Sequence, residues 1–410
     1  MLMWDKALEA WVQRLRQRVN LPLLVGWRTG DAAEATHSWM LGAFDRPLVE
    51  MDVRDAAGLP ALLNPSLDGL GEAYVEGRID LRGNIADILG MAHHMAELAE
   101  ADSGGALKRL VQTFTHSRKS DQQAIQYHYD VSNEFYAEWL DPSMVYSCAY
   151  FENGDESLDE AQRKKIDHIL AKVQLSPGQT LLDIGCGWGA LVMRAAQQFG
   201  ARCVGITLSQ NQFELATERV RAAGLQDQVE IRLQDYRDVS GHFDRITSVG
   251  MFEHVGLKHL TDYFRIIHDL LSPDGWCLNH GITSTDARDG ETTHGGGRFI
   301  DRYVFPQGEL PHIATVLRTM QEGGLEAFDV ENLRRHYART CAIWAENFEA
   351  HEDKIRELAG DKRFRIWHVY LAGCAYAFEQ DLISLYQIVC AKAARPPHAL
   401  PWSRRYIYAD

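Results

Sequence analysis

The clearest pattern of hydrophobic and polar positions follows a capping box, Ser157-Leu158-Asp159-Glu160. After it, apolar residues recur at steps of three and four, which is the spacing of one face of a helix. The pattern predicts an amphipathic helix that runs to Pro177. The apolar positions are Leu158, Ala161, Ile166, Ile169, Leu170 and Val173.

Beyond Pro177, short apolar runs alternate with helical stretches at intervals of roughly 20 to 25 residues. Such alternation predicts a doubly wound, mostly parallel α/β sheet, in which ligands bind beyond the carboxyl ends of the strands. Helices are expected up to Gln198, from Gln210 and from His259. The predicted strands are Thr180–Ile184, Cys203–Thr207, Val229–Leu233, Arg245–Val249 and, after a turn at Pro273-Asp274-Gly275, Trp276–His280.

The first 120 residues mix short helical and strand-like stretches and carry no motif with an evident chemical role. The polar run SRKSDQQ, at 117–123, has no apolar periodicity and is typical of a linker. We therefore expect two domains, a smaller and mainly helical one at 1–120 and the α/β domain at 121–410.

Composition and charge narrow the class of protein. The chain has 410 residues, 46% of them hydrophobic and 24% charged, which is ordinary for a globular protein. Its formal net charge of -15 argues against a nucleic-acid partner, because phosphate contacts need clustered Lys and Arg.

The seven cysteines show neither a CxxC pair nor zinc-site spacing, so we expect reduced thiols, no metal and a cytoplasmic location. No window of about 18 apolar residues predicts a membrane span, and the N-terminus has no basic region followed by an apolar core that would predict an export signal. These observations do not exclude peripheral contact with a membrane.

Three glycines, Gly185, Gly187 and Gly189, follow the first predicted strand and precede a helix. Such a turn lets the backbone approach a ligand, although it also occurs as a plain tight turn. Asp183, two residues before the first glycine, suits a cationic ligand end better than a pyrophosphate. The pattern favours S-adenosylmethionine, which carries an ammonium and a sulfonium and has no phosphate.

The next two strand ends extend this candidate cofactor site. Thr207 and Gln212 follow the second strand, where a ribose hydroxyl would be bound. Asp235 and Tyr236 follow the third strand, where a carboxylate and a ring suit adenine. An acidic residue is usual for ribose at the end of the second strand, and its absence here favours a particular subfamily.

Several strings, in this order and spacing, resemble bacterial cyclopropane-fatty-acyl-phospholipid synthases. The resemblance covers most of the chain and implies a Rossmann-like methyltransferase sheet. It begins near Gly69–Gly77 and continues through the aromatic stretch 364–389. The strings are YHYDVSN at 127–133, YSCAYF at 146–151, LDIGCGWG at 182–189, ITLSQNQ at 206–212, SVGMFEHVG at 248–256 and YVFP at 303–306.

This resemblance implies an enzyme that moves the methyl of S-adenosylmethionine onto the cis double bond of a phospholipid acyl chain and then closes a cyclopropane ring. It also implies a bound bicarbonate that accepts the proton lost by the new methyl. The implied bicarbonate residues are Cys148, Glu253, His280 with Ile282, and Tyr337. Tyr146 and Ser147 match residues that contact the methionine end of the cofactor.

Each of these residues also has a purely structural interpretation. Cys148 and His280 are compatible with core packing, Glu253 with a bond to a helix start, and Tyr337 lies in an undistinctive string. His254 is expected to be structural.

Two stretches depart from the family pattern, the glycine-rich loop at 283–298 and the tail at 395–410. We interpret His93-His94 as a surface pair on a helix. The aromatic stretch from Phe364, continuing through Tyr386, is expected to be a helix that either lines an acyl tunnel or packs in the core.

The sequence therefore predicts a cytoplasmic enzyme, peripheral to the inner membrane, that acts on phospholipid acyl chains as a homodimer. Its N-terminal domain is expected to serve lipid access and dimer contacts. The alternatives are a fatty-acyl C-methyltransferase with a methyl-branched or methylene product, a small-molecule N-methyltransferase, and a catalytically silent lipid-binding protein.

Overall fold

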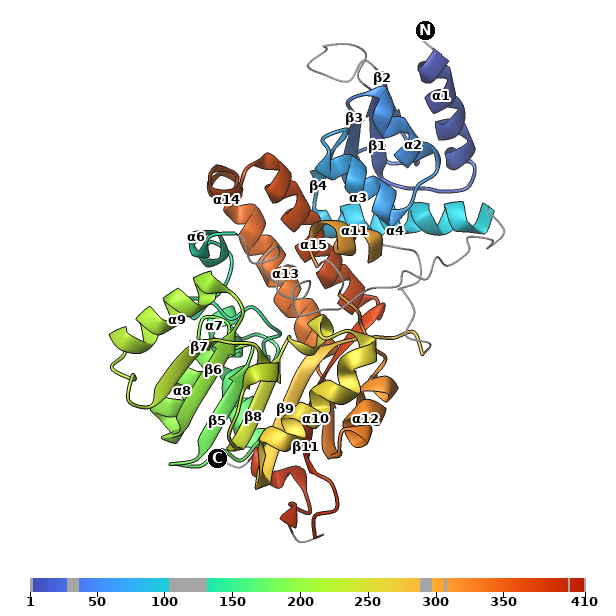
Figure 1. The fold of residues 1–410 in the computed structure, drawn as a ribbon. Helices are drawn as coiled ribbons and strands as arrows, with labels where there is room; N and C mark the ends of the chain where they lie inside the picture. Colours follow the sequence, from blue (N-terminus) through green and yellow to red (C-terminus); the bar gives the residue numbers. More distant parts are fainter. Residues whose placement is uncertain are drawn as a thin grey trace. The chain divides into compact units, whose positions relative to one another are not determined.

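A computed structural model describes residues 3–27, 37–102, 131–287, 297–305, 308–396 and 399–408 (Figure 1). These residues form two compact units. The first unit holds the described residues up to 102 together with 297–304 and 359–376, and the second holds 131–287, 305–358 and 377–408. A single boundary at residue 120 therefore leaves out two later segments of the first unit. The predicted linker at 117–123 lies outside the described residues.

The first unit combines helices with a four-stranded sheet of order β2-β1-β3-β4, in which β1 and β3 are parallel and the other pairs antiparallel. In β3, buried Val49, Met51 and Val53 alternate with two partly exposed acidic residues, as a half-buried strand requires. The strands are β1 (Leu23–Trp27), β2 (His37–Met40), β3 (Val49–Val53) and β4 (Ile79–Gly83). The helices are α1 (Met3–Arg16), α2 (Leu59–Leu63), α3 (Leu67–Val75), α4 (Ile85–Asp102), α11 (Gly297–Tyr303) and most of α15 (Asp361–Glu379), with a 3-10 turn at Ala56–Gly58.

Specific contacts hold the two later segments in the first unit. Arg365 of α15 donates one guanidinium N–H to the Tyr74 carbonyl at 3.2 Å and another to Asp80 at 2.9 Å. The Phe299 backbone N–H of α11 donates to Asp68 at 2.8 Å. His93 of α4 is not a surface residue as expected. Its side chain is 13% exposed and packs 5.3 Å from the Tyr376 ring, whereas the side chain of its neighbour His94 is 48% exposed.

The second unit is built on a seven-stranded sheet of order β10-β11-β9-β8-β5-β6-β7. The strands from β5 to β9 pair in parallel, while β11 runs antiparallel to both of its neighbours. This confirms the predicted doubly wound, mostly parallel sheet. The strands are β5 (Thr180–Ile184), β6 (Arg202–Thr207), β7 (Val229–Leu233), β8 (Phe243–Val249), β9 (Leu271–Ser284), β10 (Leu325–Asn332) and β11 (Ile383–Lys392).

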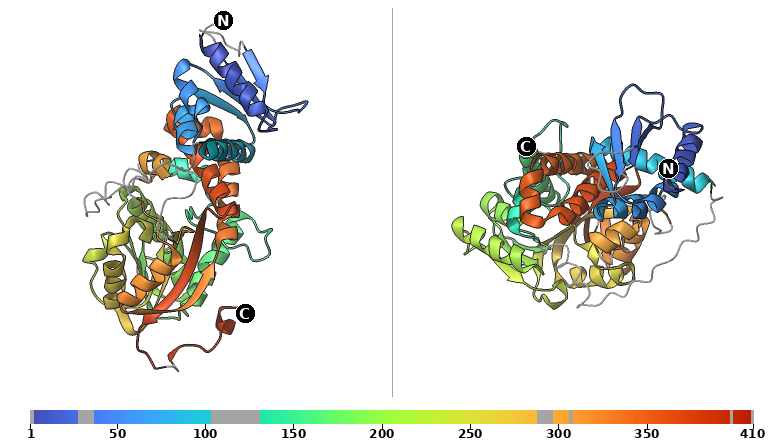
Figure 2. Two further views of the ribbon diagram at one scale, coloured as in Figure 1. Left: turned by 90° about the vertical axis from the view of Figure 1, so that its right-hand side faces the viewer. Right: turned by 90° about the horizontal axis from the view of Figure 1, so that it is seen from above.

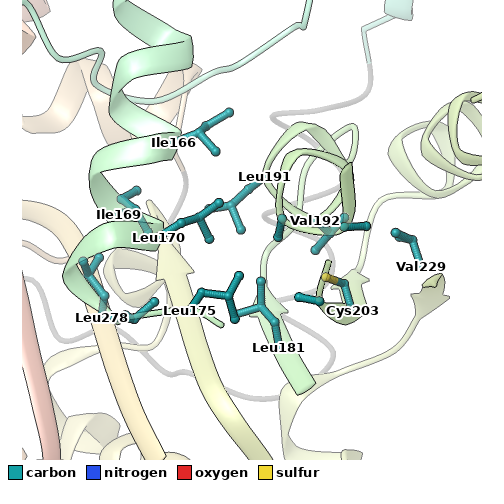
Figure 3. Packing of buried hydrophobic residues seen from close by; sticks show 14 of the residues in the cluster. Ile166, Ile169, Leu170, Leu175, Leu181, Leu191, Val192, Cys203, Val229 and Leu278 are labelled. Carbon is teal, nitrogen blue, oxygen red and sulfur yellow. The ribbon is translucent and has the colours of Figure 1, made fainter. Parts of the chain in front are cut away.

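Helices cover both faces of this sheet because its strands are apolar on both sides. Leu181 of β5 packs in the cluster formed with α7 and α8, which Figure 3 shows from close by. The next residue, Leu182, packs in the opposite cluster with α10 and α12, which lie along the other face (Figure 2). The helices of this unit are α6 (Asn133–Ala137), α7 (Leu158–Lys172), α8 (Ala190–Phe199), α9 (Gln210–Ala222), α10 (Leu260–Leu270), α12 (Ile313–Glu322), α13 (Arg334–Ala350) and α14 (Glu352–Ala359).

Among the described residues, this unit also has four 3-10 turns, at Tyr236–Asp238, Phe252–His254, Leu257–His259 and Arg404–Ile407. The last belongs to the tail, where the Tyr406 ring packs 6.0 Å from that of Trp276 on β9. The tail therefore lies against the sheet of its own unit. Residues 397–398 and 409–410 of the tail, and 288–296 of the glycine-rich loop, lie outside the described residues.

Two predictions about the strands need correction, and one strand was not predicted at all. The expected helix from Phe364 through Tyr386 ends at Glu379, and Asp381, with φ +59°, separates it from β11. Because β11 is buried on both faces, its apolar run has no alternation to distinguish it from a helix. The turn at Pro273-Asp274-Gly275 lies within β9, where the register against β8 shifts. β10 was not predicted. In the described part of the chain, no helix is long and apolar enough to cross a membrane.

Candidate active site

The glycine turn between β5 and α8 opens onto a cavity. Gly185, Gly187 and Gly189 have φ values of +84°, +54° and +86°, a region that side chains disfavour. A Cβ on Gly187 meets no atom of the described residues within 4 Å, whereas one on Gly189 lies 3.4 Å from Ala216 of α9. Gly187 thus borders open space, and Gly189 serves close helix packing.

The cavity lies at the carboxyl ends of the central parallel strands, as predicted for a doubly wound sheet. It is lined by nine of the ten residues predicted to bind the cofactor, and Gly189 is the exception. The nine are Tyr146, Ser147, Asp183, Gly185, Gly187, Thr207, Gln212, Asp235 and Tyr236.

Asp183 places a buried carboxylate at the end of β5. It is 3% exposed, and its Oδ1 accepts a hydrogen bond of 2.7 Å from the Thr247 hydroxyl. Burial raises the pKa of Asp183 to about 6, although the Thr247 bond and the charge of Lys165 oppose the shift. The carboxyl is therefore mainly ionised at neutral pH and attracts a cationic ligand group.

The residues predicted for ribose and adenine are held by their neighbours. The Thr207 hydroxyl donates to the Gln212 side-chain oxygen at 2.8 Å. Asp235 accepts two hydrogen bonds from the Arg237 guanidinium, at 2.9 and 2.6 Å, and the Tyr236 ring packs edge-on against Tyr263. These contacts preorganise the far end of the cavity.

Glu253 is a second buried carboxylate, in the 3-10 turn that follows β8. It is 8% exposed, and its Oε1 accepts a 2.7 Å hydrogen bond from the Ile282 backbone N–H. Its Oε2 is buried without a hydrogen-bond partner among the described residues. Burial raises the pKa of Glu253 to about 7, so the group exchanges a proton near neutral pH.

His280, two residues before Ile282, is also buried. Its Nδ1 lies 3.2 Å from the Gln387 side-chain nitrogen on β11, and its Nε2 has no hydrogen-bond partner among the described residues. Burial and the charges of Lys165 and Lys172 hold the pKa of His280 well below its usual value. The imidazole is therefore neutral.

Cys148 and Tyr337 meet at one backbone carbonyl, that of Leu333. The Cys148 thiol lies 3.8 Å from this oxygen, and the Tyr337 backbone N–H donates to it at 3.0 Å. Burial raises the pKa of the Cys148 thiol, which is fully buried and therefore protonated. The Tyr337 ring packs 4.5 Å from that of Phe378.

Strand β11 links these residues. The Leu333 backbone N–H donates to the Leu385 carbonyl at 2.9 Å, and Leu385 is the register partner of Ile282. Gln387, two residues further along β11, pairs with His280. The five residues predicted for the reaction thus connect through the first half of β11, and none of them lines the cavity.

The sequence analysis missed several cavity residues, and it discounted His254. Trp188, whose indole N–H donates to Asn133 at 2.8 Å, lies inside the glycine string and was within reach of sequence reasoning. Arg237 and Lys165 also line the cavity, but their sequence context predicts solvent-exposed positions, in a turn for Arg237 and on a helix for Lys165. Residues 127–130 of the YHYDVSN string lie outside the described residues.

The sheet order, the antiparallel β11 and the glycine turn at a cavity define a Rossmann-like methyltransferase fold. The chain belongs to the mycolic acid cyclopropane synthetase family, whose model matches residues 116–388. This confirms the family resemblance predicted from the sequence.

Two kinds of relative agree with this assignment. A probable fatty acid methyltransferase of Pseudomonas putida is 44% identical over 365 residues, which span 88% of this chain and 92% of that protein. The cyclopropane synthase MmaA2 of Mycobacterium tuberculosis aligns with a TM-score of 0.64 at 36% identity, over 66% of this chain and 98% of that one. The mycolic acid cyclopropane synthase CmaA1, complexed with SAH and CTAB, aligns with a TM-score of 0.63 at 36% identity, over 66% of this chain and 98% of that one.

Proposed function

We propose that this protein transfers the methyl of S-adenosylmethionine to the cis double bond of an unsaturated acyl chain in a phospholipid and then closes a cyclopropane ring. The observation that carries the proposal is Glu253, a buried carboxylate whose pKa is near neutrality and whose Oε2 has no hydrogen-bond partner among the described residues. It sits in sequence between Met251 and His254, which line the cavity. Ring closure requires a base for the proton lost from the transferred methyl, and Glu253 would help to hold that base beside the methyl-transfer site.

The cavity suits S-adenosylmethionine. Its open space beside Gly187 admits a ligand that a side chain there would displace, and the Asp183 carboxylate offers a partner for the ammonium. The bound cofactor supplies an electrophilic methyl on a sulfonium. The chain contributes by holding that group in line with the alkene and by excluding water from the cation that forms. A relative at 36% identity has been determined with SAH, which supports the same ligand here.

Bicarbonate fits the second group of residues. Glu253 Oε2 and His280 Nε2 are both buried without partners among the described residues, and buried polar atoms ordinarily have one. Cys148, Glu253, His280 and Tyr337 would hold the ion, which supplies a base for the proton lost from the transferred methyl. The Ile282 N–H already bonds to Glu253, so its role is to orient that carboxylate.

A fatty-acyl C-methyltransferase is the second candidate, favoured by the name of the Pseudomonas relative. Both reactions begin with the same methyl transfer and differ in the fate of the cation. We also propose a cytoplasmic homodimer that contacts the inner membrane peripherally, with the first unit serving lipid access and dimer contacts. A phospholipid substrate requires such membrane contact.

Expression in a host without this activity, followed by mass spectrometry and proton NMR of the phospholipid acyl chains, tests the proposal. We expect acyl chains that gain one CH2 and show cyclopropane ring protons. A gain of CH2 that leaves a methyl-branched alkene or a methylene, without ring protons, would instead establish the second candidate. Unchanged lipids, with the Gly187→Val variant as the matched inactive control, would contradict both.

Bicarbonate has its own test. Depleting it from the purified enzyme should lower the cyclisation rate, and adding it back should restore that rate. A cyclisation rate that does not depend on bicarbonate would contradict the role of the ion but not the proposed methyl transfer.

A further inference from the structure

Lys165 carries a buried positive charge into the cavity. It lies on α7, is 2% exposed and lines the same cavity as the glycine turn. Its ammonium donates a 2.6 Å hydrogen bond to the Ser147 hydroxyl. A Lys side chain is rarely buried unless a partner compensates its charge.

No carboxylate accepts a hydrogen bond from Lys165 within the described residues. The charges of Asp141 and Asp183 act on the Lys165 ammonium without a hydrogen bond. Asp141 instead accepts hydrogen bonds from the backbone N–H groups of Ser143 and Val145. Asp183 accepts one from the Thr247 hydroxyl. An ammonium has three donor hydrogens, and Ser147 takes one. Burial lowers the pKa of Lys165 to about 8, so the group is still mainly charged at neutral pH.

The same helix shows how this protein otherwise compensates a buried ammonium. Lys172, seven residues further along α7, is 1% exposed and forms ion pairs with Glu331 at 2.5 Å and Asp329 at 3.5 Å. It does not line the cavity. Lys165 is equally buried, but the neutral hydroxyl of Ser147 is the only hydrogen-bond partner that the described residues give its ammonium. An anionic group of a ligand is therefore the missing partner.

We propose that Lys165, together with Ser147, binds the carboxylate of the amino-acid end of S-adenosylmethionine. Asp183 lines the same cavity with the opposite charge and faces the ammonium of that zwitterion. The inference rests on the cofactor proposed above and assigns it an orientation. The carboxylate end lies toward α7 and the adenosine end toward Asp235 and Tyr236.

Calorimetry with two ligands tests this assignment. S-adenosylmethionine and its decarboxylated form share the sulfonium and the amine and differ in the carboxylate. Wild-type protein should bind S-adenosylmethionine about 10- to 100-fold more tightly, as expected for one charge-assisted hydrogen-bonded contact. Lys165→Met should bring the two affinities close to equal, because it should weaken the binding of S-adenosylmethionine and leave that of the decarboxylated form unchanged. Lys164→Met, the adjacent position outside the cavity, should keep it.

The outcomes separate the inference from the proposed function. If wild-type protein binds neither ligand, the proposed cofactor is wrong. If it binds both with equal affinity, or if Lys165→Met weakens both equally, Lys165 has a structural role and the inference is overturned. Thermal unfolding checks that the variant is folded, and Lys165→Gln is a second variant. The wild-type comparison decides the carboxylate contact even if neither variant folds.

Discussion

The ring of Phe252 packs directly on the backbone of Gly281. A Cβ built on Gly281 would lie 1.8 Å from Cε1 of that ring, a distance that two non-bonded carbon atoms cannot adopt without displacement. Phe252 precedes Glu253, and Gly281 lies between His280 and Ile282. The contact therefore sets the spacing of the two segments that carry the buried carboxylate and imidazole.

Gly281→Ala should displace Phe252 and with it the 2.7 Å bond between Ile282 and Glu253. We expect a loss of about 1 to 3 kcal/mol in the free energy of unfolding, the usual cost of overpacking, together with reduced turnover. Urea unfolding and a lipid assay measure the two effects. Adding Phe252→Leu makes room for the new methyl, so the double variant should lose less than the sum of the single changes. Strict additivity would contradict the proposed contact.

Replacing Glu253 by Gln should change how stability depends on pH. The folded protein holds the Glu253 proton up to a pKa of about 7, whereas the ordinary value is 4.5. Wild-type stability from this group is thus fully present below about 4.5 and is lost as the pH rises through 7. We expect Glu253→Gln to gain on the order of 2 kcal/mol relative to wild type between pH 5 and pH 8.

Urea unfolding at both pH values measures this difference, and Glu326→Gln, at an exposed position of β10, is the control. The same relative stability at pH 5 and pH 8 would show that Glu253 is not buried as a raised-pKa acid.

The same Glu253→Gln change should slow cyclisation by about a hundred- to ten-thousand-fold, the usual weight of a general base. Cofactor affinity should persist, because Glu253 does not line the cavity. Methyl transfer should suffer less than proton removal, so methyl-branched alkenes or alcohols are expected among the products. Product analysis by mass spectrometry measures the partition. Normal cyclisation by the variant would dismiss Glu253 from the mechanism.

Gly187→Val should abolish binding of S-adenosylmethionine. Gly187 has φ +54°, and a β-branched side chain is strained there as well as projecting into the cavity. We expect no heat of binding in calorimetry while circular dichroism stays close to wild type. Gly224→Val is a matched control, because Gly224 also has positive φ and open space but lies outside the cavity. Equal affinity in the folded Gly187 variant would contradict the cofactor site.

The cofactor half of the site was predictable because its signals are local. Asp183 lies at the end of β5, and Gly185 and Gly187 lie in the turn that follows it. The sheet therefore brings all three to the cavity without help from distant residues. Lys165 was not predictable, because the charged run Arg163-Lys164-Lys165 on an amphipathic helix is expected to be solvent-exposed. Only the tertiary packing of α7 buries it. His254 was discounted beside Glu253, yet it is His254 that lines the cavity.

The reaction half depended on the family resemblance, since its connections are long-range. The contact of His280 with Gln387 spans 107 residues, and that of Cys148 with Leu333 spans 185. Local periodicity carries no information about such pairs, and β11 itself reads as a continuation of the preceding helix.

The position of β11 also governs how this unit is made on the ribosome. β11 is the last strand to be translated, yet it lies between β9 and β10 in the finished sheet. Until residues 383–392 emerge, the nascent chain exposes the open edge of β9, and β10 has no sheet neighbour to join. An uncovered apolar edge of this kind invites pairing with other chains. Messages truncated before this strand should therefore yield aggregated product, and the site should assemble only after translation is nearly complete.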